Sequence, residues 1–306
     1  MSRRGQTCVW WFVSLAGQQQ IGPFRLLSMV NRGQSSQVWS VIDDRDQARL
    51  ALKILLEDFR KNREHISYLR NEHAVGQVLD HPNVVHIYDY GNERGLPYLS
   101  MELFTAPNMK DIIMRSREQM AWLVPKMIKG AAAGLAHLHS LGYVHRDVKP
   151  DNFLVDSDGT VKLIDFALAQ KKKSGLAKLF AGKSKIQGTR SYMSPEQIRG
   201  ETLDERADVY SFACTLFHLL IGTPPFTGAS STDLLNKHLS TPPPQLDIYH
   251  KNVTPEFSKL VQASMAKDRD GRPSSMDAFL RELQAVQVFR RRPPPPGKTD
   301  GGGNPT

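Results

Sequence analysis

The chain has 306 residues, of which 40% are hydrophobic and 23% are charged, a composition typical of a soluble globular protein with one large or two small domains. Its longest aromatic-rich apolar run, residues 8–16, falls short of the roughly 18 residues that a membrane-spanning helix needs, so we expect no membrane span. The formal net charge of +9 comes partly from basic runs at residues 171–185 and 290–292, which either attract acidic substrates, nucleic acid or anionic lipid, or are simply solvated.

The first third of the chain has the pattern of a sheet with one helix. The expected elements are strands at residues 26–30, 38–43 and 50–55, a helix at 64–79, and strands at 84–90 and 98–103. A loop at residues 31–37 is expected to join the first two strands. The helix should end before Pro82, because proline cannot continue a helix.

The remainder of the chain is mostly helical. The expected helices lie at residues 111–117, 122–139, 208–221, 232–239, 254–265 and 275–288, with a strand pair at 153–155 and 161–164 and a turn at 193–198. Thr254, Pro255 and Glu256 give a clear helix start: a capping hydroxyl, a proline at the first helical position and an acid in the first turn. Residues 1–20 are expected to form a flexible arm, and the Pro- and Gly-rich residues 286–306 a disordered tail.

Residues 145–152, which read HRDVKPDN, and the DFA sequence that begins at Asp165 carry most of the chemistry. The carboxylate of Asp147 can accept a proton from a hydroxyl. The amide oxygen of Asn152 and the carboxylate of Asp165 are oxygen ligands of the kind that Mg²⁺ prefers. This set of an aspartate, a lysine two residues on and an asparagine five residues on suits phosphoryl transfer, in which the protein mainly positions groups and neutralises charge.

These two motifs resemble the catalytic loop and the metal-binding motif of the eukaryotic-like (Hanks-type) serine/threonine protein kinases. The YMSPEQ sequence at residues 192–197 is similar to that of the bacterial members. The resemblance covers roughly residues 21–285 and implies the α+β, two-lobed protein kinase fold. A small antiparallel β-sheet lobe with one helix is expected at about 21–103 and a larger, mainly α-helical lobe at about 104–285, with the nucleotide between them.

The resemblance assigns roles to the residues of the catalytic loop. Asp147 is expected to be the catalytic base, or to orient the acceptor hydroxyl, and Lys149 to neutralise the γ-phosphate. Asn152 and Asp165 are expected to hold Mg²⁺, with Mn²⁺ as an alternative ion, against the β- and γ-phosphates of ATP. A lysine at position 149 is similar to the serine/threonine class rather than the tyrosine class.

The resemblance also implies a nucleotide-binding set in the first part of the chain. Lys53 lies in an otherwise apolar strand and is expected to bind the α- and β-phosphates, because a buried ammonium needs anionic partners. Glu72 is its expected partner from the helix, and Glu64 is a weaker candidate. The expected contacts of the adenine, the back of its pocket and the hinge are Val38, Ala51, Leu154, Met101, Glu102 and Leu103.

The loop expected to cover the phosphates departs from the family pattern. The three glycines of that pattern fall on Asn31, Gly33 and Ser36, so one of them survives. Glycine serves there because it allows positive φ and a close backbone approach, and asparagine tolerates the left-handed region better than most residues. With Arg32 and Val38, these residues are expected to contact the nucleotide. We expect a working but stiffer flap that holds ATP more weakly.

Ala167 stands where the family has the glycine of DFG. Its methyl group is expected to reduce access to the flipped, inactive arrangement of the motif without touching the metal carboxylate. The activation segment is expected at residues 165–196, with Ser174 or Ser184 as phosphorylation sites and Arg146 as the group that binds the added phosphate. Three structural contacts are implied: Thr189 with Asp147 and Lys149, Glu196 with Arg272, and Asp208 with the backbone of the catalytic loop.

The sequence therefore predicts a cytoplasmic serine/threonine protein kinase that phosphorylates proteins, itself included, with ATP. A pseudokinase that binds nucleotide or partners without turnover is the alternative, favoured by the degenerate loop and by Ala167. An enzyme of the kinase fold that acts on small molecules is a third possibility, opposed by the SPE sequence at residues 194–196. The two cysteines, Cys8 and Cys214, have no metal spacing or disulfide framework, which favours a reducing interior. No specific nucleic-acid partner is expected, and no oligomeric state is indicated.

Overall fold

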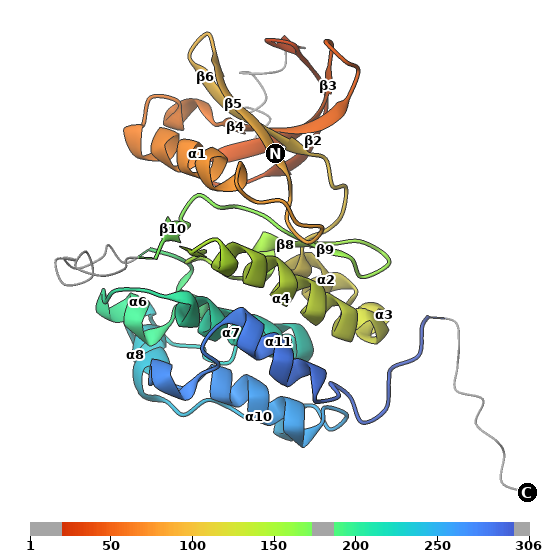
Figure 1. Ribbon diagram of the computed structural model, residues 1–306, viewed down its shortest axis with the longest axis vertical. Coiled ribbons are helices and arrows are strands. Elements are labelled where there is room, and N and C mark those ends of the chain that lie inside the picture. Colours follow the sequence, from red (N-terminus) through yellow and green to blue (C-terminus); the bar gives the residue numbers. More distant parts are fainter. Residues whose placement is uncertain (1–19, 173–186, 297–306) are drawn as a thin grey trace, which may run out of the picture. The chain divides into compact units, whose positions relative to one another are not determined.

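The computed structural model describes residues 20–172 and 187–296, and these form two compact units. Within the described chain, the first unit takes in the residues up to His73 and Ile87–Leu103, and the second takes in Ala74–His86 and the residues from Phe104 onward. The first unit is built mainly of strands and the second mainly of helices, so the expected α+β class is confirmed (Figure 1).

The first unit contains one antiparallel sheet with strand order β1-β2-β3-β4-β6-β5 (Figure 1). Its elements are β1 (Gln20–Ile21), β2 (Phe24–Arg32), β3 (Ser36–Asp43), β4 (Arg49–Leu55), the 3₁₀ turn η1 (Glu57–Phe59), most of α1 (Arg63–Gly76), β5 (Ile87–Glu93) and β6 (Leu96–Glu102). Arg94 and Gly95 join β5 to β6 with φ values of 50° and 83°. Two positive φ values in a two-residue turn match the twist of antiparallel strands, which fixes this hairpin.

The core of the first unit packs on one face of this sheet. Its buried members are Ile21, Phe24, Val41, Leu52, Ile54 and Leu96. Alternate residues of a strand point to the same face, and Leu52 and Ile54 of β4 are both 0% exposed. Lys53, between them, therefore projects from the opposite face of the sheet, where only a polar or charged partner stabilises it.

Three element boundaries in this part of the chain differ from those expected. The loop expected at residues 31–37 is reduced to Gly33–Ser35, because β2 continues to Arg32 and β3 begins at Ser36. The strand expected at residues 84–90 begins at Ile87. Residues 84 and 85 belong instead to the second unit, where their backbone pairs with that of Leu163. Helix α1 ends at Gly76 rather than at residue 79, in line with the low helix propensity of glycine.

The second unit is mostly helical. Its helices are α2 (Met109–Arg115), α3 (Arg117–Met120), α4 (Val124–Ser140), α6 (Pro195–Arg199), α7 (Glu205–Ile221), α8 (Ser231–Ser240), α9 (Leu246–Tyr249), α10 (Pro255–Ser264) and α11 (Met276–Gln284). Its 3₁₀ turns are η2 (Ala121–Leu123), η3 (Pro150–Asn152), η4 (Arg190–Tyr192) and η5 (Arg269–Gly271). The short strands β8 (Phe153–Val155) and β9 (Val161–Leu163) pair antiparallel, as do β7 (Tyr143–Val144) and β10 (Gln170–Lys171).

Helix α7 is the centre of this unit. Every residue from Ala207 to Leu220 is buried, and a helix that is buried on all sides is enclosed by other elements. It packs against α2, α4, α10 and α11 (Figure 1). Phe212 of α7 contacts the rings of Phe153 in β8 and Phe279 in α11, with ring centroids 6.1 and 5.5 Å apart. The helix thus provides a fixed base for the loop between β7 and β8.

The end of the described chain is more ordered than expected. Helix α11 ends at Gln284, and the disordered tail was expected from residue 286. Instead, Val288 and Phe289 are only 7% and 6% exposed, and the backbone N–H of Thr254 donates to the Val288 carbonyl at 3.1 Å. The tail expectation is wrong for these residues, because both side chains are buried and their backbone pairs with Val253 and Thr254 just before α10.

Two further expectations concern the ends of the chain and the membrane. Residues 1–19 and 297–306, which hold most of the expected arm and part of the expected tail, lie outside the described residues. No helix of the described chain is both long enough and apolar enough to cross a membrane.

Candidate active site

An ion pair joins β4 to α1 in the first unit. The Nζ atom of Lys53 lies 2.6 Å from Oε2 of Glu72, and the two side chains are 16% and 3% exposed. The expected partnership of Lys53 and Glu72 is therefore confirmed. Glu64, the weaker candidate, instead accepts a hydrogen bond from the hydroxyl of Tyr68 at 2.8 Å. A lysine so placed presents a positive charge that is held in position by the helix.

The residues expected to contact the base lie on neighbouring strands. Ala51 of β4 is paired with Met101 of β6, and both are largely buried. Strand β3 lies on the other side of β4 from β6, and its Val38 is paired with Lys53 of β4. The structure thus brings these four residues together across three adjacent strands. Glu102 ends β6 and Leu103 follows it, whereas Leu154 lies on β8 in the second unit.

The loop expected to cover the phosphates has a simple backbone. Asn31 is paired with Val38 in the β2–β3 ladder, and Ser36 is the first residue of β3. Between them, the N–H of Gly33 donates to the Ser36 carbonyl at 2.8 Å. Neither Asn31 nor Ser36 has a positive φ. These two positions therefore do not require a left-handed backbone. Asn31 and Ser36 replace the family's glycines without backbone strain.

The carboxylate of Asp147 is surrounded by donors from two segments. Lys149 Nζ lies 2.6 Å from its Oδ2, and the N–H and Oγ1 of Thr189 donate to its Oδ1 at 2.9 and 3.0 Å. Lys149 also donates to Thr189 Oγ1 at 3.0 Å. The contact expected between Thr189 and these two residues is confirmed. Because the carboxylate is held at both oxygens, its orientation is fixed before any substrate binds.

A backbone hydrogen bond to Asn152 from Ile164, the residue before Asp165, brings Asn152 and Asp165 close together. The side-chain amide of Asn152 donates to the Asp147 backbone carbonyl at 2.8 Å, and the backbone carbonyl of Asn152 accepts the N–H of Ile164 at 3.0 Å. Asp165 is the next residue and has φ 65°, a region that non-glycine residues adopt only when the surrounding structure holds them there. The amide oxygen of Asn152 and the carboxylate of Asp165 are thus presented by fixed backbone.

Two oxygen-bearing groups are too few to hold a metal ion by themselves, but they suit Mg²⁺ that is also bound by phosphates and water. Mg²⁺ is commonly bound by one or two protein oxygen ligands together with phosphates and several waters. The described residues contain no cluster of three or more His, Cys, Asp or Glu side chains that could hold a metal. An ion at this position would therefore depend on phosphate oxygens and water for its remaining ligands.

Asp208, on the buried helix α7, fixes the start of the loop at residues 145–152. Its carboxylate accepts the N–H groups of His145 and Arg146 at 2.6 and 2.9 Å, as expected, and lies 2.9 Å from Nε2 of His139. Burial by itself raises the pKa of Asp208, but His139 and the His145 N–H favour the charged form and hold this pKa below its ordinary value. The role of His139 was not anticipated, since a histidine in a helix gives no signal of its partner.

A model of the protein kinase domain family matches residues 24–283. The chain belongs to that family. Among curated proteins, it is 32% identical over 274 residues to the probable serine/threonine-protein kinase PknB of Bifidobacterium longum, a match that covers 86% of this chain and 39% of the relative. It is 31% identical over 287 residues to the serine/threonine-protein kinase PknA of Mycobacterium tuberculosis, covering 90% of this chain and 65% of the relative. The chain thus spans between about two fifths and two thirds of the length of these curated relatives.

In this kinase domain, the end of the activation segment is tied to the catalytic loop. The amide Nε2 of Gln197 donates to the Arg146 carbonyl at 2.8 Å, and Gln197 also completes a capping box with Ser194 at the start of α6. Gly188 has φ 115°, and a Cβ there would lie 3.0 Å from the same carbonyl, so only glycine fits. No pattern in the sequence indicated that Gln197 would join the activation segment to the catalytic loop. The expected phosphorylation sites, Ser174 and Ser184, lie outside the described residues.

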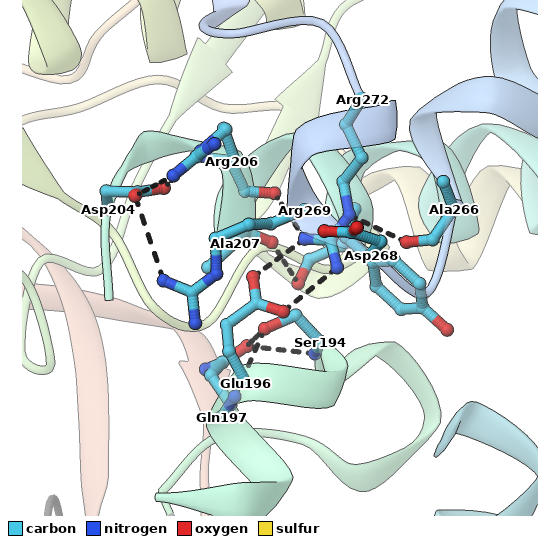
Figure 2. Close-up of polar contacts among 12 residues, drawn as sticks. Ser194, Glu196, Gln197, Asp204, Arg206, Ala207, Ala266, Asp268, Arg269 and Arg272 are labelled. Atoms are coloured by element: carbon cyan, nitrogen blue, oxygen red, sulfur yellow. Dashed lines mark hydrogen bonds and ion pairs between the residues drawn. The ribbon is translucent and has the colours of Figure 1, made fainter. Parts of the chain in front are cut away.

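The kinase domain also contains the expected pair of Glu196 and Arg272. Figure 2 shows the guanidinium of Arg272 facing the Glu196 carboxylate. Its two terminal nitrogens donate to the carboxylate oxygens at 2.7 and 2.9 Å. Arg272 also donates to the carbonyls of Ala266 and Arg206 at 2.8 and 2.9 Å. The pair joins α6 to the segment after α10, and hence the activation segment to the helical core.

Proposed function

We propose that the protein is an ATP-dependent serine/threonine protein kinase, which transfers the γ-phosphate of ATP to Ser and Thr hydroxyls of proteins, itself included. The observation that carries this proposal is the Asp147 carboxylate, which Lys149 and Thr189 hold at both oxygens. Asn152 donates to the carbonyl of the same aspartate, so a group that binds at Asn152 lies near it. The names of the curated relatives support the proposal.

In the proposed reaction, Asp147 accepts a hydrogen bond from the acceptor hydroxyl and aims its oxygen at the γ-phosphorus. A bond forms between that oxygen and phosphorus, the bond from phosphorus to the β–γ bridging oxygen breaks, and ADP leaves. The hydroxyl proton passes to Asp147 and then to solvent. Lys149 stabilises the charge on the transferred group. Mg²⁺, when bound by Asn152 and Asp165, would neutralise phosphate charge; Mn²⁺ is an alternative ion.

The first unit is proposed to supply the nucleotide contacts. Lys53, held by Glu72, is proposed to bind the α- and β-phosphates, because charge-assisted hydrogen bonds between an ammonium group and phosphate oxygens are strong. The remaining proposed contacts are Asn31, Arg32, Gly33 and Ser36 for the phosphates, and Val38, Ala51, Met101, Glu102 and Leu103, with Leu154 of the second unit, for the base. The cytoplasm is the proposed location, since ATP is available there.

Incubation with labelled ATP and Mg²⁺, with one acidic and one basic acceptor protein, tests this proposal. We expect label on phosphoserine and phosphothreonine, and a loss of at least about 100-fold in Asp147→Asn. Asp158→Asn, at an exposed position in the β8–β9 turn, is the matched control and should keep full activity. A folded wild-type protein that binds ATP and transfers no phosphate to any acceptor would instead be a pseudokinase.

A further inference from the structure

Arg190 lies next to the proposed catalytic carboxylate. It directly follows Thr189, whose N–H and hydroxyl both contact Asp147, so its Cα is only about 3.8 Å further along the chain. It is exposed and begins the 3₁₀ turn η4. An extended arginine side chain at this place can reach groups that lie beside an acceptor hydroxyl bound at Asp147.

The guanidinium of Arg190 is positioned but not neutralised. Its Nη1 donates to Oγ of Ser231 in the first turn of α8 at 2.7 Å. Within residues 20–172 and 187–296, it forms no ion pair with a carboxylate. The acid in the same turn of α8, Asp233, accepts the Ala229 N–H at 2.9 Å and lies 3.4 Å from Lys237. Arg190 therefore keeps most of its five donors for another anion.

The carboxylates of the catalytic loop each have a cation of their own. Asp147 is paired with Lys149 at 2.6 Å, and Asp151 with Lys110 at 3.2 Å. In each case the cation offsets part of the carboxylate's attraction for a basic side chain of a substrate. The N-terminal end of α8 adds the partial positive charge of a helix start close to Arg190. The electrostatic balance around the proposed acceptor position therefore favours anionic groups.

We propose that Arg190 is a specificity-determining residue, which selects acceptor proteins with an anionic side chain within two residues of the phosphorylated Ser or Thr. This inference rests on the proposed kinase function. An extended peptide advances about 3.3–3.6 Å per residue, so such a side chain begins within about 7 Å of the acceptor. The planar guanidinium binds carboxylate and phosphate groups alike through paired hydrogen bonds. The anion is thus an Asp or Glu carboxylate or an earlier-added phosphate.

Matched peptides with a single serine acceptor test the inference. One series carries Asp in turn at each of the two positions on either side of the acceptor, a second carries Asn, and a third carries phosphoserine. We expect kcat/KM for the best Asp peptide to exceed that of its Asn counterpart by about 5- to 30-fold, mainly through KM. The phosphoserine series shows whether phosphate is read as well as carboxylate.

Variants assign that preference to Arg190. Arg190→Gln should lower kcat/KM on the Asp peptide to that on the Asn peptide, Arg190→Lys should keep part of the preference, and Arg190→Glu should favour peptides with Lys at the same position. Arg281→Gln, an exposed arginine on α11, is the control and should retain the preference. Equal rates on Asp and Asn peptides in the wild type, or an equal loss on both in Arg190→Gln, would overturn the inference. Absence of transfer to every peptide, with no autophosphorylation, would instead overturn the proposed function.

Discussion

Arg272 donates both terminal nitrogens of its guanidinium to the two carboxylate oxygens of Glu196, and the two side chains are 0% and 2% exposed. The residues are 76 positions apart, and the pair joins α6 to the segment that follows α10 (Figure 2). Three backbone carbonyls, those of Ala266, Arg206 and Lys267, accept the other hydrogen bonds of Arg272. A charged pair so deeply buried is costly to break from one side, because the remaining charge keeps its desolvation cost and loses its partner.

The first prediction concerns this pair. Arg272→Met should lower the free energy of unfolding by about 3–5 kcal/mol, since it leaves the Glu196 carboxylate buried without its cation. Chemical denaturation measures the change. The double variant Glu196→Leu/Arg272→Met should recover part of the loss. As a control, Arg199→Met removes an exposed partner of Glu201 and should cost less than about 1 kcal/mol. Similar losses in both single variants would contradict the argument.

The second prediction concerns Lys53 and Glu72. Glu72→Gln should reduce kcat/KM for ATP by about 10- to 100-fold, because the amide holds the lysine less firmly than the carboxylate does. Steady-state kinetics at varied ATP measures the effect. Glu64→Gln, at an exposed position on the same helix, should change this constant less than about twofold. If Glu64→Gln were as impaired as Glu72→Gln, the assigned partner would be wrong.

The third prediction concerns the hydroxyl of Thr189, which lies 3.0 Å from both Asp147 and Lys149. Thr189→Val keeps the shape and removes both hydrogen bonds, so kcat should fall by about 10- to 100-fold. Thr189→Ser retains the hydroxyl and should keep most of the activity. The serine variant thus separates a positioning role from a packing role: if both variants lost the same activity, the hydrogen bonds would not be the cause.

The fourth prediction concerns the degenerate glycine loop. The double variant Asn31→Gly/Ser36→Gly should lower the apparent KM for ATP by about two- to fivefold, because a more adaptable backbone can approach the phosphates. Each glycine should also cost roughly 0.5–1 kcal/mol of stability, since these positions lie in β2 and β3. Ser28→Gly, exposed in β2, should have the stability cost without the kinetic gain. An unchanged KM in the double variant would show that the missing glycines do not weaken ATP binding.

The fifth prediction concerns acid stability. His238 is fully buried, its Nδ1 lies 2.9 Å from the Tyr210 hydroxyl, and burial, followed by the nearby Lys267 charge, lowers its pKa from 6.5 to about 4. Between these values the unfolded chain binds more protons than the folded one, so stability falls as pH falls from 6.5 towards 4. At pH 5 this group accounts for a loss of about 2 kcal/mol relative to pH 8.

Denaturation of His238→Gln at pH 8 and pH 5 checks this expectation. The variant should be less stable at pH 8, where the native imidazole packs neutral, and should lose less stability on acidification than the wild type does. His86→Gln, at an exposed position, serves as the control and should follow the wild-type pH dependence. An identical pH dependence in His238→Gln and wild type would show that another group is responsible.

Much of the fold and most of the candidate site could be predicted from the sequence. Lys53 in an apolar strand requires an anion, and Glu72, the partner that the kinase resemblance implied, lies 2.6 Å from it. The spacing from Asp147 to Asn152 and on to Asp165 indicated phosphoryl transfer. These predictions rest on residues whose order and spacing match the kinase family, and on the cost of burying a charged side chain without a partner.

The tertiary structure alone decided those contacts between distant segments that the kinase resemblance did not imply. No local pattern indicates that Gln197 holds the Arg146 carbonyl, that His139 contacts Asp208, or that Phe289 is buried. Val84 and Val85 read as the start of a strand, yet their backbone pairs with Leu163, far along the chain. The sequence determines which side chains are available at each position. Burial and pairing across long sequence distances depend on how helices and strands pack together, and a local sequence pattern carries no information about that packing.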